Sequence, residues 1–278
     1  MCIRDRSATA GGGRNNDALG KILRINPLLS DSLPYTVPAD NPFVGDDSML
    51  DEIYTLGHRN PHNLSFTKDG TILVVDVGRD NVDEVNVLDA GADYGWSERE
   101  GTFVHLEAGG LIEGTALLPS NDAKLNFTYP AAQVGHFGSV GQRFSGQAIA
   151  GGFVIENGSE LSGQYIYGQF GNYGDAYHSE LTDIQAAIVK GDPSRLSQAA
   201  TKRLAIYFDH DSNPKTKNVR RESLLDVFDD SPQFEDVGRA DTRFGQGPNG
   251  ELYVMSKRNN TIYLVSNSIQ SQPAEEIE

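Results

Sequence analysis

The sequence has little cysteine, few basic residues and no long apolar run. Its 278 residues include one cysteine, Cys2, so no disulfide can form within the chain. No apolar run approaches the roughly 20 residues that cross a bilayer, and we therefore expect no membrane span. The 23 basic and 39 acidic residues give a net charge of −16, which disfavours a nucleic-acid partner because such a partner needs a basic face.

Several catalytic signatures are also missing. The chain has neither a P-loop nor a Gly-Xaa-Ser-Xaa-Gly nucleophile elbow. Only two of the six histidines, His58 and His62, stand four residues apart, and Pro61 between them predicts a turn over 57–63. A zinc site on one helix face is therefore not predicted.

The two ends of the sequence differ from its middle. The opening MCIRDR resembles neither a signal peptide nor a strand, and we interpret residues 1–10 as an artefactual leader. Residues 267–278 are polar and acidic, which is typical of a disordered tail or linker. We therefore expect one domain over 11–266.

A recurring pattern of a glycine turn followed by β-branched or aromatic residues fills the middle of the chain. Asp69-Gly70 precedes TILVV and Asn249-Gly250 precedes ELYVM, and both patterns predict antiparallel hairpins. Other strands are predicted at 20–26, 84–88, 127–129, 150–155, 164–167, 181–184, 205–208 and 261–265, and short helices at 183–189 and 222–228.

These units return at intervals of roughly 90 residues, which favours the blades of a β-propeller. The class predicted is therefore all-β. A β-sandwich is the alternative, but the long loops expected at 27–51 and 97–125 favour the propeller.

The densest segment is 57–96, GHRNPHNLSFTKDGTILVVDVGRDNVDEVNVLDAGADYGW. Arg59 and Asn60 offer planar donors on a turn, which suit carboxylates or carbonyls; a surface turn with a salt bridge is the alternative. The loop after the next strand, with Asp80 and Glu84, offers oxygen ligands for a hard cation such as calcium. Its spacing is not that of an EF-hand, and a solvated loop is the alternative.

A local basic focus lies near the end of the chain. Arg239 and Arg243 flank Asp241 just before a predicted strand. They could hold an anionic cofactor, or they could form an Arg–Asp–Arg structural network.

The motifs GKILRIN, PADNPF, GHRNPHNL, DVG-DNVDEVN and GADYGW together resemble the glucose/sorbosone dehydrogenase family. This family includes soluble sugar dehydrogenases that use pyrroloquinoline quinone (PQQ). Looser similarity extends through AIAGGFVIENG, LSGQYIYGQFG and GRADTRFGQGPNGELYVMSK, so the resemblance runs from about residue 11 to 266. It implies a six-bladed β-propeller of the quinoprotein dehydrogenase type, here incomplete at its N-terminal side.

The resemblance also implies roles for residues. Arg59 and Asn60 correspond to a pair that contacts the quinone, and Arg239 and Arg243 fall where a later blade supplies arginines to it. Gly78 and Arg79 correspond to a dipeptide whose carbonyls bind calcium, with Asp80 and Glu84 in support. The implied reaction is oxidation of an aldose or related sugar, with hydride transfer to calcium-bound PQQ and then electron transfer to an acceptor.

The sequence also departs from the family pattern. The general-base histidine is expected upstream of this chain, so the catalytic residue is unknown and the chain alone is expected to be inactive. The strand at 148–158 ends in Ile155-Glu156-Asn157, where the family carries a positive charge, and no cation is evident at 169–171. A non-catalytic propeller for binding or adhesion and a calcium-dependent lactonase therefore remain alternatives. We expect a periplasmic or secreted location, and poor solubility because missing blades leave open sheet edges.

Overall fold

The computed structural model describes residues 17–27, 34–79, 81–108, 111–136, 148–156, 159–171, 173–204, 206–208, 219–221, 223–225, 239–258 and 260–265. The predicted leader and tail lie outside these residues, as do Asp80, Cys2 and His210. In the described part of the chain, no helix is both long enough and apolar enough to cross a membrane.

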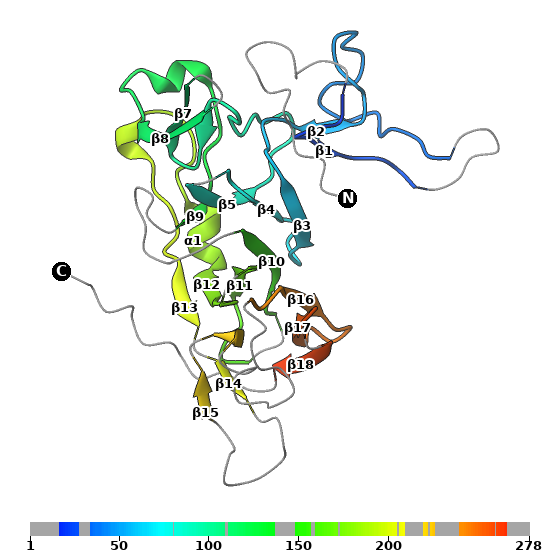
Figure 1. Cartoon of the computed structure of the whole chain (residues 1–278). Coiled ribbons are helices and arrows are strands. Elements are labelled where there is room, and N and C mark those ends of the chain that lie inside the picture. The colour runs from blue at the N-terminus through cyan, green and yellow to red at the C-terminus, as the bar shows by residue number, and fades with distance from the viewer. Residues whose placement is uncertain are drawn as a thin grey trace.

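Three antiparallel sheets form the body of the molecule (Figure 1). The first contains β3 (Pro61–Phe66), β4 (Ile72–Asp76), β5 (Val82–Val87) and β9 (Ala132–Gly135). The second contains β10 (Ile149–Val154), β11 (Gln164–Gln169), β12 (Ala176–Glu180) and β13 (Lys202–Leu204). The third contains β16 (Thr242–Gln246), β17 (Leu252–Ser256) and β18 (Thr261–Val265).

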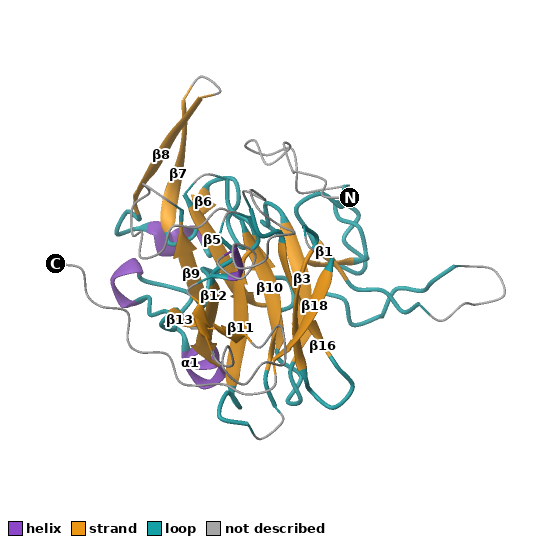
Figure 2. Cartoon of the chain, turned by 60° about the horizontal axis from the view of Figure 1, so that its bottom comes forward, coloured by secondary structure: helices purple, strands orange, loops and turns teal. Residues whose placement is uncertain are grey.

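Smaller elements surround these sheets. They are β1 (Ile22–Leu23) with β2 (Ile53–Thr55); β6 (Arg99–Glu100), β7 (Phe103–Ala108) and β8 (Leu111–Leu117); and β14 (Ile206–Phe208) with β15 (Val219–Arg221). The helices are η1 (Asp122–Leu125), α1 (Leu181–Ala186) and η2 (Pro193–Arg195). The β7–β8 hairpin projects from the body in Figure 2.

The strands β3, β10 and β16 lie side by side, one from each large sheet (Figure 2). A methyl group on Gly151 would lie 2.5 Å from Asn63 Cβ, so the third residues of β10 and β3 are level. At the ends of β16 and β10, Gln246 Nε2 donates to the Val154 carbonyl at 3.0 Å. At their starts, the Phe170 N–H donates to the Ala148 carbonyl at 2.7 Å and the Thr242 N–H donates to the Phe170 carbonyl at 2.9 Å. The three strands therefore run in the same direction and begin on one face of the molecule.

The apolar core lies between neighbouring sheets. One cluster joins the first and second sheets through side chains such as Val75, Val85 and Tyr167. Another joins the second and third sheets through Ile166 and Phe244. Because both faces of the middle sheet are covered, all six residues of β11 are buried. Sheets packed face to face around a set of inner strands are the arrangement of propeller blades.

The hairpins expected at both Asp-Gly and Asn-Gly turns are confirmed as β3–β4 and β16–β17. The strand predicted at 181–184 is wrong: α1 occupies it, because Leu181 and Ile184 stand one helical turn apart and both pack on the core. The strand at 127–129 is absent, since those residues pair with single backbone groups of distant loops. The loop expected at 97–125 instead contains β6, β7 and β8.

Candidate functional site

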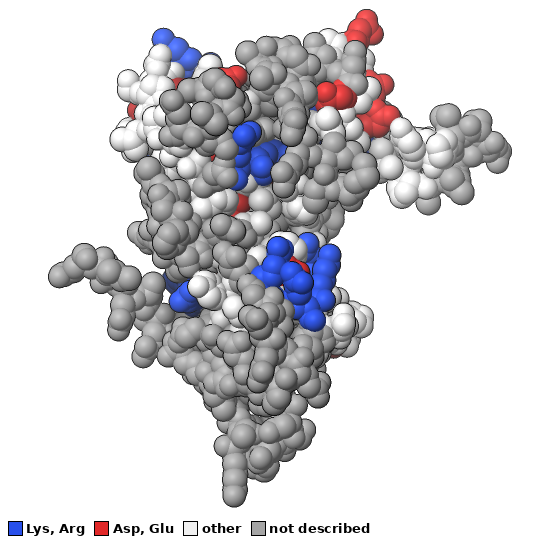
Figure 3. All heavy atoms as spheres, viewed as in Figure 1, with Lys and Arg blue, Asp and Glu red and all other residues white. Residues whose placement is uncertain are grey.

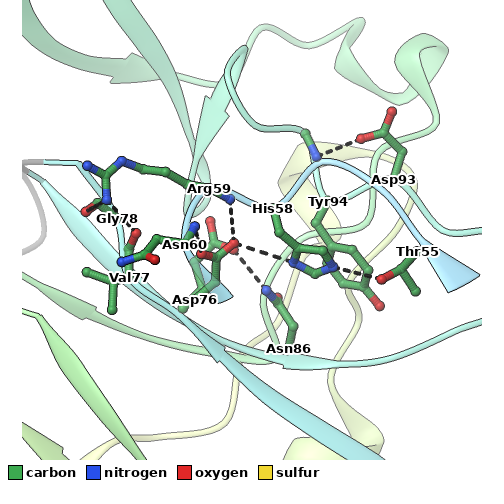
Figure 4. A network of polar contacts seen from close by, with 12 residues as sticks. Thr55, His58, Arg59, Asn60, Asp76, Val77, Gly78, Asn86, Asp93 and Tyr94 are labelled. Carbon is green, nitrogen blue, oxygen red and sulfur yellow. Dashed lines mark hydrogen bonds and ion pairs between the residues drawn. The ribbon is translucent and has the colours of Figure 1, made fainter. Parts of the chain in front are cut away.

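A tight turn places Arg59 and Asn60 just before β3. Gly57 adopts φ +72°, and a Cβ there would lie 2.1 Å from Asp93 Oδ1, so the turn requires glycine. The Asp76 carboxylate, at the end of β4, accepts the backbone N–H of Arg59 at 2.9 Å and that of Asn60 at 2.7 Å (Figure 4). The predicted turn is shorter than expected, because β3 begins at Pro61 and already contains His62.

The Arg59 side chain reaches across to the loop that follows β4. Its Nη1 donates to the Val77 carbonyl at 2.9 Å and to the Gly78 carbonyl at 2.7 Å (Figure 4). Its guanidinium carbon lies 5.6 Å from the centroid of the Trp96 ring, within cation–π range. The first two residue pairs singled out in the sequence, Arg59-Asn60 and Gly78-Arg79, are therefore brought together.

A buried polar chain lies behind this turn. His58 Nε2 is 2.9 Å from Thr55 Oγ1, His58 Nδ1 is 3.4 Å from Asp76 Oδ2, and the imidazole stacks on Tyr94 with centroids 4.6 Å apart (Figure 4). The Thr–His–Asp order is that of a nucleophilic triad. Thr55 and His58 are, however, both 0% exposed, so no substrate reaches them and their role is to support the turn.

The loop after β4 is bound by Glu100, a residue that the sequence did not single out. Its Oε1 accepts the N–H groups of Arg79 at 2.8 Å, Asn81 at 2.8 Å and Val82 at 3.1 Å. Its Oε2 accepts Asn81 Nδ2 at 2.9 Å. Glu100 lies on β6 and is 1% exposed. No local motif marks it, because its function depends on a contact with a loop some 20 positions earlier.

Glu84, predicted to support a metal, lies on β5 with both oxygens engaged. Oε1 accepts the Gly101 N–H at 2.7 Å and Oε2 accepts Asn86 Nδ2 at 2.9 Å. Burial, reinforced by the negative charge of Asp76, raises the pKa of Glu84 to about 8. A protonated carboxyl is a poor calcium ligand, so its assignment to the metal stays a prediction that this geometry does not favour.

Asp83, beside Glu84 on β5, supports the same loop from the other side. It accepts the Gly78 N–H at 2.9 Å and lies 2.9 Å from His136 Nε2. Burial raises the pKa of this carboxyl in spite of the adjacent imidazole. Gly78 is thus fixed through its own N–H as well as through its carbonyl.

The second predicted basic group forms a compact cluster on β16 and the residues before it. Asp241 lies between two arginines, with Oδ1 2.6 Å from Arg239 Nε and Oδ2 2.9 Å from Arg258 Nε. The guanidinium carbons of Arg239 and Arg243 lie 5.4 Å and 3.9 Å from the Phe170 centroid. Figure 3 shows this gathering of positive side chains at the surface over β16 and β17.

The structure brings the two basic groups to the same face. Arg59 and Asn60 precede β3, and Arg239 and Arg243 stand at the start of β16, where the parallel inner strands all begin. His62 on β3 is close enough to Arg243 to be affected by its charge: burial lowers the His62 pKa most, and the positive charge of Arg243 lowers it further. Four predicted cofactor residues, Arg59, Asn60, Arg239 and Arg243, therefore lie at one end of the inner strands, and we call this end of the molecule the cofactor face.

The residues on this face suit an anion better than they suit a cage for a metal. Among the described residues, no group of three or more His, Cys, Asp or Glu could hold a metal ion. A cation here would depend on backbone carbonyls and on oxygens of a bound cofactor. The Gly78 carbonyl accepts one hydrogen bond from Arg59 and retains a second lone pair.

The parallel inner strands and face-to-face sheets define a protein of the β-propeller class. A solved structure titled a glucose dehydrogenase confirms this fold, with a TM-score of 0.50 and 19% identity over 91% of this chain and 55% of that one. This chain spans about half the length of that structure.

The family model for glucose/sorbosone dehydrogenase matches residues 1–113. The HIPL2 protein of Arabidopsis thaliana is 31% identical over 163 residues, which are 54% of this chain and 22% of that protein. Quinoprotein glucose dehydrogenase B of Acinetobacter calcoaceticus is 41% identical over 78 residues, which are 28% of this chain and 15% of that protein. The resemblance found in the motifs is therefore confirmed: the chain is similar to the glucose/sorbosone dehydrogenase family, with the family model matching its first 113 residues.

Proposed function

We propose that this chain is the cofactor-holding part of a sugar dehydrogenase that uses PQQ and calcium. The observation that carries the proposal is the placement of Arg59, Arg239 and Arg243 on one face of a chain whose net charge is −16. Such a concentration of guanidinium groups in an acidic protein suits an anionic ligand. PQQ is an ortho-quinone that carries three carboxylates.

The arginines would hold the cofactor from two sheets. Phe170 supports Arg243 with the guanidinium carbon 3.9 Å from the ring centroid, and Asp241 fixes Arg239 through its Nε at 2.6 Å. A guanidinium held in place loses little freedom on binding a carboxylate, so its hydrogen bonds contribute more affinity. Asn60, with its backbone fixed by Asp76, would present its amide beside Arg59.

The Gly78 and Arg79 carbonyls would face the calcium ion. When bound, PQQ supplies a hydride-accepting quinone, and calcium beside it acts as a Lewis acid. The chain's part is to hold these carbonyls in place, and Asp83 and Arg59 already fix Gly78 at 2.9 Å and 2.7 Å. We assign no proton acceptor among the described residues; the general-base histidine and an exported location stay predictions.

The alternatives receive less support. A lactonase would need a metal site built from side-chain carboxylates, and the described residues contain no such group. The non-catalytic propeller rested on the departures at 155–157 and 169–171. Residue 155 follows the last residue of β10, at the end away from the cofactor face. Phe170 lies within 169–171, and its ring makes cation–π contacts with Arg239 and Arg243.

The proposal is tested by titrating the chain with PQQ in the presence of calcium and following the quinone absorbance. We expect binding, and a loss of roughly tenfold or more in affinity in Arg59→Ala and Arg243→Ala. Arg195→Ala, an exposed arginine on η2, is the control and should bind as the unaltered chain does. Absence of binding by the unaltered chain would overturn the proposal. Dye reduction with aldoses, in a chain extended at its N-terminus, tests the oxidation itself.

A further inference from the structure

Glu100 accepts four hydrogen bonds from the loop after β4. Arg59 makes two hydrogen bonds to this loop, and Asp83 makes one. Three backbone N–H groups converge on Oε1, and the Asn81 amide is bound by Oε2. The carboxylate is 1% exposed, so these bonds replace its hydration. Bonds from N–H groups to a charged acceptor are about twice as strong as neutral ones.

These bonds determine the direction of a carbonyl. In a trans peptide the C=O of one residue and the N–H of the next point to opposite sides of the plane. Because the Arg79 N–H points to Glu100, the Gly78 carbonyl must point away from it, and there it meets Arg59 Nη1 at 2.7 Å. The peptide between Asn81 and Val82 is oriented in the same way. The Val82 N–H donates to Glu100, and the Asn81 carbonyl on the opposite side accepts the His136 N–H at 2.7 Å.

The fit between loop and carboxylate is close. A Cβ on Gly78 would lie 1.8 Å from the Val82 carbonyl oxygen and 2.8 Å from Glu100 Oε1. Both distances are too short for any side chain, so the loop closes around the carboxylate only with glycine at 78. The position of Glu100 and the identity of Gly78 are therefore parts of one arrangement.

We propose that Glu100 is a positioning residue for the cofactor face: its buried carboxylate binds the N–H groups of Arg79, Asn81 and Val82 and so directs the Gly78 carbonyl toward the bound cation. The inference rests on the proposed function for the identity of that cation. Glu100 itself touches neither cofactor nor metal in this arrangement. Its effect passes through the peptide plane between Gly78 and Arg79.

The test compares Glu100→Gln with Asp122→Asn. Both replace one oxygen of a buried carboxylate by an amide, and Asp122 is ion-paired with Arg99, the residue before Glu100 on β6. Asp122 makes its described contacts with Arg99 and Tyr129 and none with the loop at 78–82. It therefore controls for loss of stability without loss of the loop's anchor.

Two readouts are needed, both on the whole chain. The first is amide hydrogen exchange of residues 79, 81 and 82 without cofactor, and the second is calcium-dependent binding of PQQ followed by absorbance. In Glu100→Gln we expect exchange at these amides to be roughly tenfold faster and PQQ binding with calcium to be roughly tenfold weaker. Asp122→Asn should lower Tm with neither effect.

Unchanged exchange in Glu100→Gln, or equal acceleration in both variants, would overturn the inference. If the unaltered chain binds no PQQ, the proposed function fails, but the exchange experiment still decides the part played by Glu100. Acceleration confined to Glu100→Gln would then support its hold on the loop.

Discussion

Asp76 Oδ2 accepts the backbone N–H of Arg59 at 2.9 Å, so one strand-end carboxylate fixes the residue that reaches the Val77 and Gly78 carbonyls. We expect Asp76→Ala to lower the free energy of unfolding by about 3 kcal/mol, because it leaves two backbone donors unpaired beside a buried imidazole. PQQ affinity should fall with it. Urea unfolding and absorbance titration measure the two effects.

Asp93→Ala is the control for this prediction. Asp93 Oδ1 accepts the Gly95 N–H at 3.0 Å and lies beside Gly57, two residues before Arg59. Its loss should cost about 1 kcal/mol. Equal destabilisation by the two substitutions would contradict the importance assigned to Asp76.

Glu84 makes stability depend on pH. Its pKa is raised from 4.5 to about 8, so between these values the folded chain holds a proton that the unfolded chain releases. Stability from this group is therefore full below about pH 4.5 and is lost as the pH rises toward 8. Glu84→Gln should raise Tm at about pH 9 and flatten the pH profile. Calorimetry across this range measures it.

The surroundings of Glu84 can accommodate either a protonated carboxyl or a glutamine amide. Asn86 Oδ1 is buried without a hydrogen-bond partner, and rotation of the amide lets it accept a hydrogen bond from the O–H of a protonated Glu84 or from the amide of a glutamine at 84. The exposed Glu160→Gln is the matched control, with no change expected in the profile. A Glu84→Gln profile that follows the unaltered chain would show that Glu84 is ionised in the folded state.

His62 reports on how closely β3 and β16 approach. Burial and the charge of Arg243 lower its pKa, while Asp76 raises it. Arg243→Ala should therefore raise the His62 pKa toward its ordinary value of 6.5, as measured by NMR titration of the imidazole. Lys190→Ala, which removes a surface cation paired with Asp89, should leave the titration unchanged. No shift in Arg243→Ala would mean that the two basic groups do not share a face.

Gly152 is expected to be indispensable to the second sheet. A Cβ there would lie 1.5 Å from the Ile166 carbonyl oxygen, so Gly152→Ala must break the pairing of β10 with β11 and should cost more than about 3 kcal/mol. Gly245→Ala, on β16, is the matched control. Its nearest neighbour would be the flexible end of Met255 at 3.2 Å, so less than about 1 kcal/mol is expected. Comparable midpoints in urea would refute the difference.

The sequence predicted the fold where local chemistry determines it. The Asp69-Gly70 turn, with apolar residues following it, suffices to define β3–β4, and the repeat of such turns indicates blades. It failed at 181–184 because a segment of only four residues is too short for its period to be recognised, and the packing of Ile184 decides for the helix. It failed at 97–125 because the prediction rests on Asp-Gly and Asn-Gly as hairpin signals, whereas Gly109-Gly110 separates β7 from β8 in the sequence.

The residues of the candidate site likewise fall into those that the sequence predicted and those that it did not. Arg59, Asn60, Arg239 and Arg243 carry distinctive chemistry, and the sequence predicted them as cofactor residues through the family resemblance. Glu100 and Asp76 were not predicted, since a buried carboxylate that binds backbone N–H groups has no signature of its own. Their roles follow only from the tertiary contact.

Arg59 and Arg243 stand at the starts of the first and third of the parallel inner strands, and β10 lies between them. The cofactor face therefore cannot assemble locally: it exists only in a chain whose β16–β18 sheet has docked on β10. During synthesis it is among the last features of this part to form. A single proteolytic cut between β13 and β16 would separate two of the three guanidinium groups from Arg59, while leaving the hydrogen bonds of the Arg59 turn intact.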